Sequence, residues 1–197
     1  VSARLKGGES QIADRVPRAG VFFCDLVGFT AYASAMEAEE VVEMLQETFR
    51  IMEEACARHR VEKIKTIGDA FMAVSGVSIP VDDPDEAIAR FSMDAALNLR
   101  THFEAQGLPL GFRMGIHSGS VLAGVLGSDR LFFDIWGDTV NFASRLESHG
   151  EKWQVRYSNE LRERLSERSS FRDCGELALK GKGKQRVWEL LGEESTR

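Results

Sequence analysis

The sequence predicts a single α+β domain in which helices pack on an antiparallel sheet. Short apolar segments of strand length alternate with longer segments whose apolar residues recur at helical spacing. Their order over the first 117 residues is strand, helix, hairpin, helix, strand. This order is typical of a ferredoxin-like βαββαβ core. A chain of 197 residues is long enough to add further strands and helices after that core.

The first strand and the first helix are predicted from neighbouring segments. Val21–Cys24 is an apolar run that ends at Asp25, as expected for a buried strand. Ser34 and Glu37 have the spacing of a capping box. Apolar residues at helical spacing follow them, so we expect one long helix that ends near Arg58.

A hairpin and a second helix come next. Residues 61–67 and 70–75 have the composition of strands and flank the turn Gly68–Asp69. Asp83, followed by a proline and two acidic residues, predicts the N-terminus of a helix. The remaining expected elements are strands at 112–117, 121–126 and 131–136, a helix over 139–148, a strand near 155, a helix after 158 and two closing strands around 181–183.

The composition restricts the classes of function. The chain has 25 Lys and Arg against 31 Asp and Glu, a formal net charge of −6. This balance argues against general electrostatic binding to nucleic acid or to anionic lipid. No segment approaches the roughly 18 apolar residues of a membrane span. Three widely spaced cysteines are typical of reduced thiols, so we expect a cytoplasmic domain.

The two ends of the chain differ in character from its middle. Residues 1–19 are polar and without sustained periodicity, so we expect a linker or the end of an upstream connector. The domain is expected over 20–192, with a short tail at 193–197. The chain does not begin with Met, so we expect a piece of a longer protein, which leaves room for an upstream sensor or membrane region.

Two carboxylates stand out by their position. Asp25 ends the first strand and Asp69 lies in the hairpin turn, so neighbouring strands would bring both to one edge of the sheet. Two carboxylates with a backbone carbonyl suit Mg²⁺ or Mn²⁺, which prefer oxygen ligands and bring phosphates with them. The turn at Gly28, Phe29 and Thr30 would offer amides to phosphate oxygens. On spacing alone, ordinary turn and cap roles for both acids stay open.

Polar residues later in the chain form two further groups. Asn141 and Arg145 are four residues apart, hence on one face of the expected helix. An amide and a guanidinium could position a sugar and a phosphoryl group, although a solvated helix face fits the same spacing. Lys180 begins a lysine- and glycine-rich turn that could approach a phosphate or form an exposed hairpin tip.

Four segments resemble the catalytic domain of class III nucleotidyl cyclases, which convert ATP or GTP to the 3′,5′-cyclic monophosphate. They are FFCDLVGFT (Phe22–Thr30), KIKTIGDAFMAVSG (Lys63–Gly76), FRMGIHSGSVLAGVLG (Phe112–Gly127) and FDIWGDTVNFASRLE (Phe133–Glu147). A fifth, LKGKG (Leu179–Gly183), falls in the expected place near the end. The segments follow the order of the family, so the resemblance implies the class III cyclase fold over nearly the whole chain.

The resemblance also implies a role for each matching residue. Asp25 and Asp69 would hold two divalent metal ions, Mg²⁺ or Mn²⁺, with the Leu26 carbonyl as a further ligand. The matching nucleotide-binding residues are Arg113 and Lys180 for the triphosphate, Asn141 for the ribose, Arg145 for the transition-state charge, and Lys65 and Asp134 for the purine. In the family the site lies between two domains in head-to-tail contact, with the metal aspartates from one and the purine, ribose and transition-state residues from the other. Because this chain has both sets, we expect a homodimer with two composite sites.

Lys65 and Asp134 predict which purine is bound. Lysine only donates hydrogen bonds and ionised aspartate only accepts them, which fits N1 and the N6 amino group of adenine. Guanine presents the opposite pattern, and guanylyl cyclases tend to have Glu and Cys at these positions. We therefore expect an adenylyl cyclase that uses ATP. The alternatives are a guanylyl cyclase or a catalytically silent, nucleotide-binding regulatory dimer.

Overall fold

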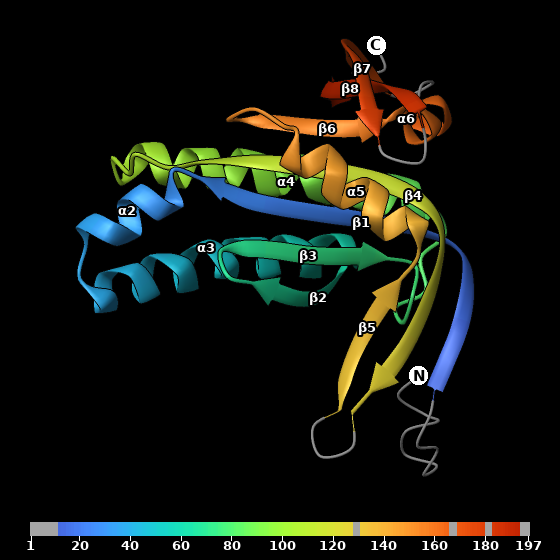
Figure 1. Ribbon diagram of the computed structural model, residues 1–197, viewed down its shortest axis with the longest axis horizontal. Coiled ribbons are helices and arrows are strands. Elements are labelled where there is room, and N and C mark those ends of the chain that lie inside the picture. The colour runs from blue at the N-terminus through green and yellow to red at the C-terminus, as the bar shows by residue number, and fades with distance from the viewer. Residues whose placement is uncertain (1–11, 128–130, 166–168, 180–182, 194–197) are drawn as a thin grey trace.

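The computed structural model describes residues 12–127, 131–165, 169–179 and 183–193. The strands are β1 (Ile12–Val27), β2 (Glu62–Ile67), β3 (Ala70–Ser75), β4 (Gly111–Leu126), β5 (Phe132–Trp136), β6 (Gln154–Ser158), β7 (Ser169–Leu179) and β8 (Gly183–Glu193). The helices are α2 (Phe29–Ala35), α3 (Ala38–His59), α4 (Pro84–Ala105), α5 (Asp138–Ser148) and α6 (Asn159–Leu165). Figure 1 shows their arrangement around one sheet.

The sheet has the order β2-β3-β1-β4-β6-β8-β7, and β5 pairs with β4 off this path. The strands β2, β3, β1 and β4 are antiparallel to their neighbours, which is the order and direction expected of a ferredoxin-like core. β6 extends the sheet in parallel to β4, and the β7–β8 hairpin closes it. The prediction of an α+β fold with a ferredoxin-like core is therefore confirmed.

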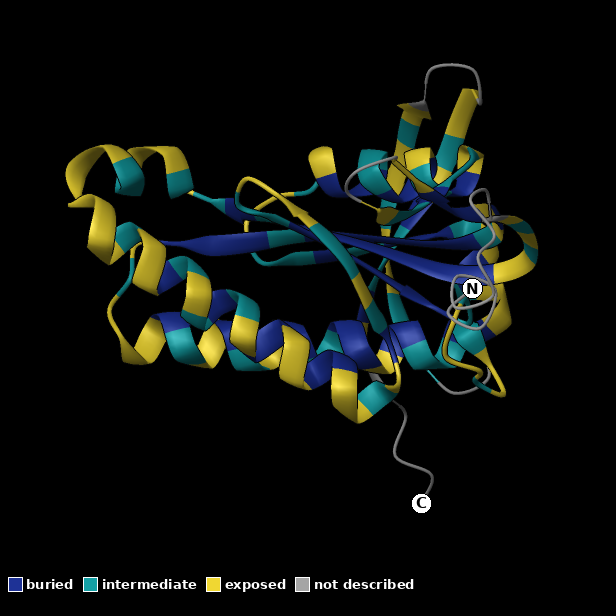
Figure 2. Ribbon diagram, turned by 90° about the horizontal axis from the view of Figure 1, so that it is seen from below, coloured by how far each residue is buried: buried dark blue, intermediate teal, exposed yellow. Residues whose placement is uncertain are grey.

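Alternate residues of β1 pack on opposite faces of the sheet, because successive strand side chains point to opposite sides. Phe22, Cys24 and Leu26 belong to the core beneath α3 and α4. Val21 and Phe23 belong to a second core with residues of β5 and α5. Figure 2 shows the buried middle of the sheet and the long helices, whose outer faces are exposed. Because both faces of the sheet are covered here, the apolar residues Val21–Cys24 of β1 do not alternate with polar ones.

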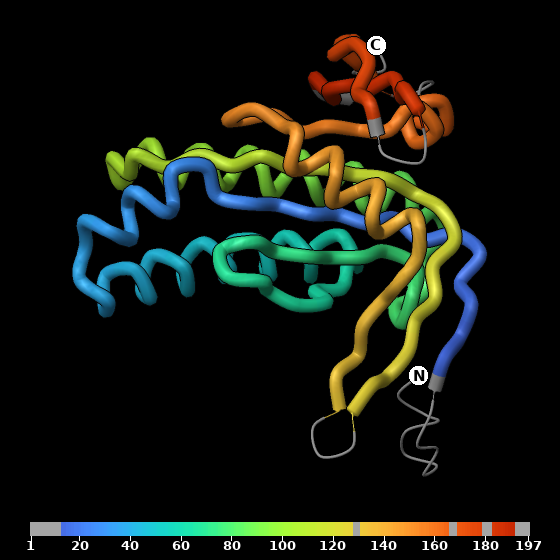
Figure 3. The backbone as a smooth tube through the Cα atoms, in the orientation of Figure 1, coloured from blue at the N-terminus to red at the C-terminus, as the bar shows by residue number. Residues whose placement is uncertain are grey.

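β1 and β4 are longer than the sequence indicated. β1 begins at Ile12, opposite Val125 of β4, so residues 12–19 belong to the sheet and not to a linker. A register shift lies between Val16 and Ala19, where Pro17 cannot donate a ladder hydrogen bond. β4 is one strand in place of the two expected at 112–117 and 121–126. The tube in Figure 3 follows both long strands as they run side by side through their bend.

The single helix expected from Ser34 is wrong. Two helices form, and Met36 between them has extended backbone, φ −113° and ψ 160°. The Ser34 hydroxyl donates to the Thr30 carbonyl at 2.8 Å, so it is used within α2 and does not cap α3. The capping box of α3 consists of Glu37 and Glu40 instead.

The other expected elements are confirmed. β2 and β3 form the hairpin around Gly68–Asp69, and Asp83 caps α4 by accepting from the backbone N–H of Asp85 at 3.0 Å. α5, β6, α6 and the closing pair β7 and β8 follow in the expected order. Among the helices of the described ranges, none combines the length and the apolar character needed to cross a bilayer.

Candidate active site

The two predicted metal-binding carboxylates lie beside each other. Asp25 is in β1 and Asp69 is in the turn between β2 and β3, and β1 pairs with β3 up to Cys24 opposite Phe71. Burial raises the pKa of Asp69, and the negative charge of Asp25 raises it further. The antiparallel register therefore brings together two acids that are 44 positions apart in sequence, at the edge where they were expected.

The peptide of Leu26 faces this carboxylate pair. Its backbone N–H lies close enough to the Asp69 carboxylate to oppose the rise in the pKa of that group. The N–H and C=O of one strand residue point to the same side, so the Leu26 carbonyl also faces the hairpin turn. Two carboxylates and one carbonyl are hard oxygen donors, which suit Mg²⁺ or Mn²⁺ whose coordination is completed by substrate phosphates. The donor set therefore fits divalent metal ions that arrive with a nucleotide.

Arg113 joins the carboxylate pair from β4. Its Nη2 donates to Asp25 Oδ2 at 2.6 Å, and its Nε donates to Glu147 Oε1 at 2.6 Å. The Arg113 side chain is 32% exposed and the Glu147 side chain only 9%, so the ion pair with Glu147 is largely shielded from water. Burial raises the pKa of Glu147, although Arg113 opposes this shift. The predicted phosphate-binding arginine thus lies at the predicted metal site.

Glu147 is the site residue that the sequence analysis missed. It follows Phe142, Ala143 and Leu146, which are the buried apolar residues of α5. A carboxylate on the apolar face of a helix requires a buried partner, because an unpaired buried charge is costly. That pattern was the available signal, and the structure identifies Arg113 as the partner.

Lys65 and Asp134 form a second group. The Lys65 ammonium on β2 is paired with Asp134 Oδ2 on β5. The other oxygen of Asp134 accepts from the backbone N–H of Ile135 at 2.9 Å, which fixes the carboxylate. The structure therefore places the two predicted purine-reading side chains in direct contact.

The third group lies on α5, which packs closely on β4. A Cβ at Gly115 would lie 2.2 Å from the Glu147 backbone nitrogen and 2.4 Å from the Ala143 carbonyl oxygen, so only glycine permits this approach. Asn141 is exposed and Arg145 is half-buried, and the helical spacing puts them on one face. β4 therefore fixes the position of the predicted ribose and transition-state residues.

The predicted phosphate-binding turn directly follows β1, three residues after Asp25. Gly28 has φ 93° and precedes α2, and its carbonyl accepts from the Tyr32 N–H at 3.1 Å. Phe29 and Thr30 form the first turn of α2. Lys180, expected at the triphosphate, lies outside the described residues.

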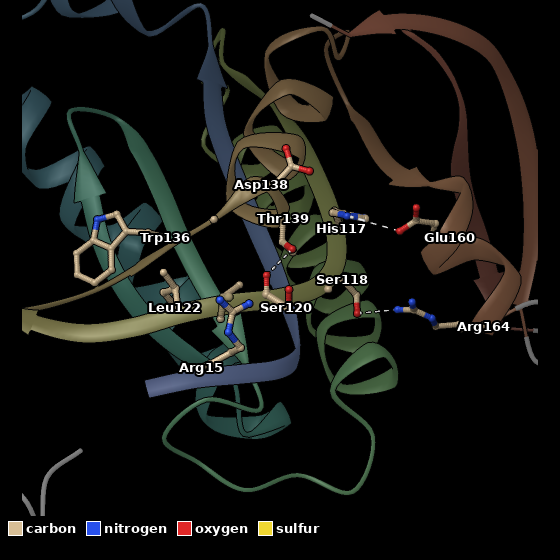
Figure 4. Close-up of a pocket in the computed structure, with 13 residues that line it drawn as sticks. Arg15, His117, Ser118, Ser120, Leu122, Trp136, Asp138, Thr139, Glu160 and Arg164 are labelled. Carbon is tan, nitrogen blue, oxygen red and sulfur yellow. Dashed lines mark hydrogen bonds and ion pairs between the residues drawn. The ribbon is translucent and has the colours of Figure 1, made fainter. Parts of the chain in front are cut away.

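A cavity of about 470 Å³ lies elsewhere, and none of the predicted site residues that the structure describes lines it. Figure 4 shows His117, Glu160 and Arg164 on one side of it and Trp136 on the other. His117 is 3% exposed and shares a hydrogen bond of 2.8 Å with the Ser158 hydroxyl. A buried histidine with a hydrogen-bond partner fits a structural role in β4.

Comparison with known proteins agrees with the geometry. Residues 12–192 match the family model described as adenylate and guanylate cyclase catalytic domain. The chain is 40% identical over 195 residues to an adenylate cyclase of Mycobacterium bovis, covering 98% of this chain and 44% of that protein. It is 35% identical over 193 residues to the guanylate cyclase soluble subunit beta-2 of Rattus norvegicus, covering 97% and 28% respectively.

Solved structures give the same result. The crystal structure of the adenylyl cyclase CyaB from P. aeruginosa has a TM-score of 0.84 at 28% identity, covering 92% of this chain and 96% of that one. The chain spans less than half the length of the Mycobacterium bovis and Rattus norvegicus proteins named above. The fold, the paired carboxylates and these matches together lead to one conclusion: the chain belongs to the family of class III adenylyl and guanylyl cyclase catalytic domains.

Proposed function

We propose that this domain is an adenylyl cyclase that converts ATP to 3′,5′-cyclic AMP and pyrophosphate. The observation on which the choice of ATP rests is the contact between Lys65 and Asp134. The two side chains present one donor and one acceptor next to each other, and adenine needs this arrangement at N1 and N6. Guanine would place its O6 acceptor and N1 donor against like groups, leaving both pairs mismatched.

The paired carboxylates account for the metal requirement. Asp25, Asp69 and the Leu26 carbonyl would hold two divalent ions, Mg²⁺ or Mn²⁺. When bound, such ions activate the 3′-hydroxyl as a nucleophile and neutralise charge on the triphosphate. The protein's own contribution to phosphoryl transfer is then mainly positioning and charge stabilisation.

Each remaining site residue has a part in that positioning. Asn141 would orient the ribose so that its 3′-oxygen attacks the α-phosphorus in line, with pyrophosphate as the leaving group. Arg145 would stabilise the negative charge that grows on the α-phosphoryl group. The terminal phosphates would be bound by Arg113, by Lys180 and by the turn at 28–30.

A homodimer would complete the site. Arg113, which binds Asp25, lies near the start of β4, whereas Asp134 pairs with Gly124 near its other end. One chain therefore presents the metal-binding and purine-reading groups at separate parts of its surface. A second copy related by C₂ symmetry would bring one group of each kind together twice, so we propose two composite sites per dimer and an inactive monomer.

We also propose a cytoplasmic location for this domain. Cys24, Cys56 and Cys174 are all free thiols, as is typical of a reducing compartment. ATP is the substrate expected there.

One experiment separates the candidate functions. The purified chain is incubated with ATP or GTP and Mn²⁺ or Mg²⁺, and the cyclic nucleotide is quantified. Cyclic AMP formed in preference to cyclic GMP supports the proposal. Preferential cyclic GMP formation identifies a guanylyl cyclase, to which relatives at 35% identity also point. Nucleotide binding without either product identifies a silent regulatory dimer.

A further inference from the structure

Glu147 and Asp25 hold the two ends of one guanidinium. The Nε of Arg113 donates to Glu147 at 2.6 Å and its Nη2 donates to Asp25 at 2.6 Å. The guanidinium is planar and its five N–H donors point in fixed directions, so one end can stay bound while the other changes its acceptor. Lysine has a single charged end and cannot do this.

The two acceptors differ in their surroundings. Glu147 lies on a helix whose backbone is in contact with β4 at Gly115, and its side chain is 9% exposed. The Asp25 side chain is 22% exposed and lies beside Asp69, where the metal ions are expected. Glu147 is therefore a fixed hydrogen-bond acceptor for Arg113, whereas the Asp25 carboxylate can exchange Arg113 for another bound cation.

Arg113 is a cation in the place where divalent ions are expected. Its Nη2 is bound to Asp25 Oδ2, which is also a predicted metal ligand. A guanidinium and a divalent ion that contact the same carboxylate lie within a few ångströms of each other, so their positive charges repel. Metal binding to Asp25 therefore favours release of Nη2, which then needs a new acceptor.

We propose that Glu147 is a positioning residue for Arg113, and that Arg113 occupies the metal site as a resident cation until metal and nucleotide arrive. This inference rests on the proposed function for the identity of the nucleotide. With Glu147 holding Nε, the freed Nη2 turns from Asp25 to the terminal phosphates of the incoming nucleotide. No bond is made or broken apart from hydrogen bonds, so the step is an exchange of acceptors.

The first test measures metal binding without nucleotide. Mn²⁺ is titrated into the purified chain and the free ion is followed by electron paramagnetic resonance. Arg113→Met removes the competing cation, so we expect the Kd for Mn²⁺ to fall about tenfold. Arg113→Lys restores a positive charge and is expected to restore most of the weaker wild-type binding. All the residues involved lie in one chain, so the result does not depend on dimerisation or on which nucleotide is used.

The second test separates KM from kcat at saturating Mn²⁺. Glu147→Leu removes the acceptor for Nε at similar volume, and we expect the KM for ATP to rise about tenfold, with kcat changed about twofold or less. Glu147→Gln keeps an acceptor oxygen and should recover most of the affinity. In an Arg113→Met background, Glu147→Leu should have little further effect, because its role requires Arg113. Glu151→Leu, at an exposed carboxylate just beyond α5, is the matched control and should leave both constants unchanged.

Two results would overturn the inference. Unchanged or weaker Mn²⁺ binding by Arg113→Met would show that Arg113 does not compete for the metal site. Additive effects of the Glu147 and Arg113 substitutions, or a loss confined to kcat, would show that Glu147 does not act through Arg113. Absence of cyclic AMP with tighter Mn²⁺ binding would instead count against the proposed function, so the two failures are distinguishable. Circular dichroism melting of each variant identifies any that do not fold.

Discussion

The Lys65 ammonium on β2 pairs with the Asp134 carboxylate on β5, although β2 pairs with β3 and β5 pairs with β4. The bend of β4 carries β5 back toward the hairpin edge of the sheet (Figure 1). Two side chains that are 69 positions apart in sequence thus present a donor and an acceptor that one edge of a purine ring can contact together. A purine that inserts between them exchanges one direct ion pair for two directional hydrogen bonds.

Replacement of this pair by residues of the opposite hydrogen-bonding polarity should shift the base preference from adenine toward guanine. Lys65→Glu with Asp134→Cys presents the polarity that guanine needs, and mispairing costs about 1–3 kcal/mol for each bidentate-type contact. We expect the ratio of kcat/KM values for ATP and GTP to shift toward GTP. Lys63→Glu on the same strand, where the lysine pairs with Glu53, is the control and should not change the ratio. A wild-type preference for GTP would contradict the assignment.

Arg145 should act on the chemical step. Removal of a group that stabilises transition-state charge lowers kcat without a comparable loss of substrate binding. We expect Arg145→Ala to reduce kcat by ~10² or more with a small change in KM, measured by steady-state kinetics with ATP. A wild-type kcat in this variant would exclude the role.

Asp69 should be required for metal binding but not for folding. Burial and the charge of Asp25 raise its pKa, so the ionised carboxylate in the folded, metal-free protein is less favourable than in the unfolded chain. Asp69→Asn should therefore melt no lower than wild type in the presence of a chelator. Added Mn²⁺ should raise the melting temperature of wild type but not of the variant. A stabilisation by Mn²⁺ that persists in the variant would place the metal elsewhere.

Gly115 should be among the most sensitive positions in the fold. A Cβ at Gly115 would lie 2.2 Å from a backbone atom of α5, whereas one at Gly119 would lie 2.7 Å from the Thr139 hydroxyl, which can rotate. Overpacking against backbone costs about 1–3 kcal/mol or more. We expect Gly115→Ala to lower the melting temperature more than Gly119→Ala, and to lower activity because α5 holds Asn141 and Arg145. The reverse order would argue against close packing of α5 on β4.

Asp94 should contribute to stability only above acid pH. Burial tends to raise its pKa, but hydrogen bonds from Arg58 and His59, each at 2.9 Å, outweigh burial and lower it. A carboxyl with a lowered folded pKa stabilises the protein above its unfolded pKa of about 4, and this contribution is lost as the pH falls through the folded value. We expect Asp94→Asn to melt about 2 °C below wild type near neutral pH. The difference should disappear in acid, and a difference that persists there would contradict the linkage between α3 and α4.

Local signals in the sequence were sufficient where one segment determines the outcome. The cap at Asp83 and the turn at Gly68–Asp69 formed as expected, because the residues that specify them are adjacent in sequence. The spacing of Ser34 and Glu37 was misleading, because the Ser34 hydroxyl bonds backward to Thr30. Two competing local partners cannot be ranked from spacing alone.

Signals that depend on distant residues were harder to read. The N-terminal half of β1 is stabilised by pairing with the far end of β4, and nothing within residues 12–19 indicates that partner. The gap between the strands expected at 112–117 and 121–126 lies within β4, where Gly119 leaves room for Thr139 of α5. The approach of Asp25 to Asp69 could be predicted, because one lies at the end of the first strand and the other in the turn of a hairpin expected to pair with that strand. The role of Glu147 required its partner, Arg113, to be placed first.

If ATP is cyclised at a site shared by two copies of this chain, the inactive variants Asp69→Asn and Arg145→Ala should complement each other when they are mixed. In a random mixture, half the dimers contain one of each, and one of the two sites in such a dimer has both intact residues. We therefore expect cyclic AMP formation to recover to about one quarter of the wild-type rate at equal total protein. A mixture no more active than the separate variants would contradict the composite site.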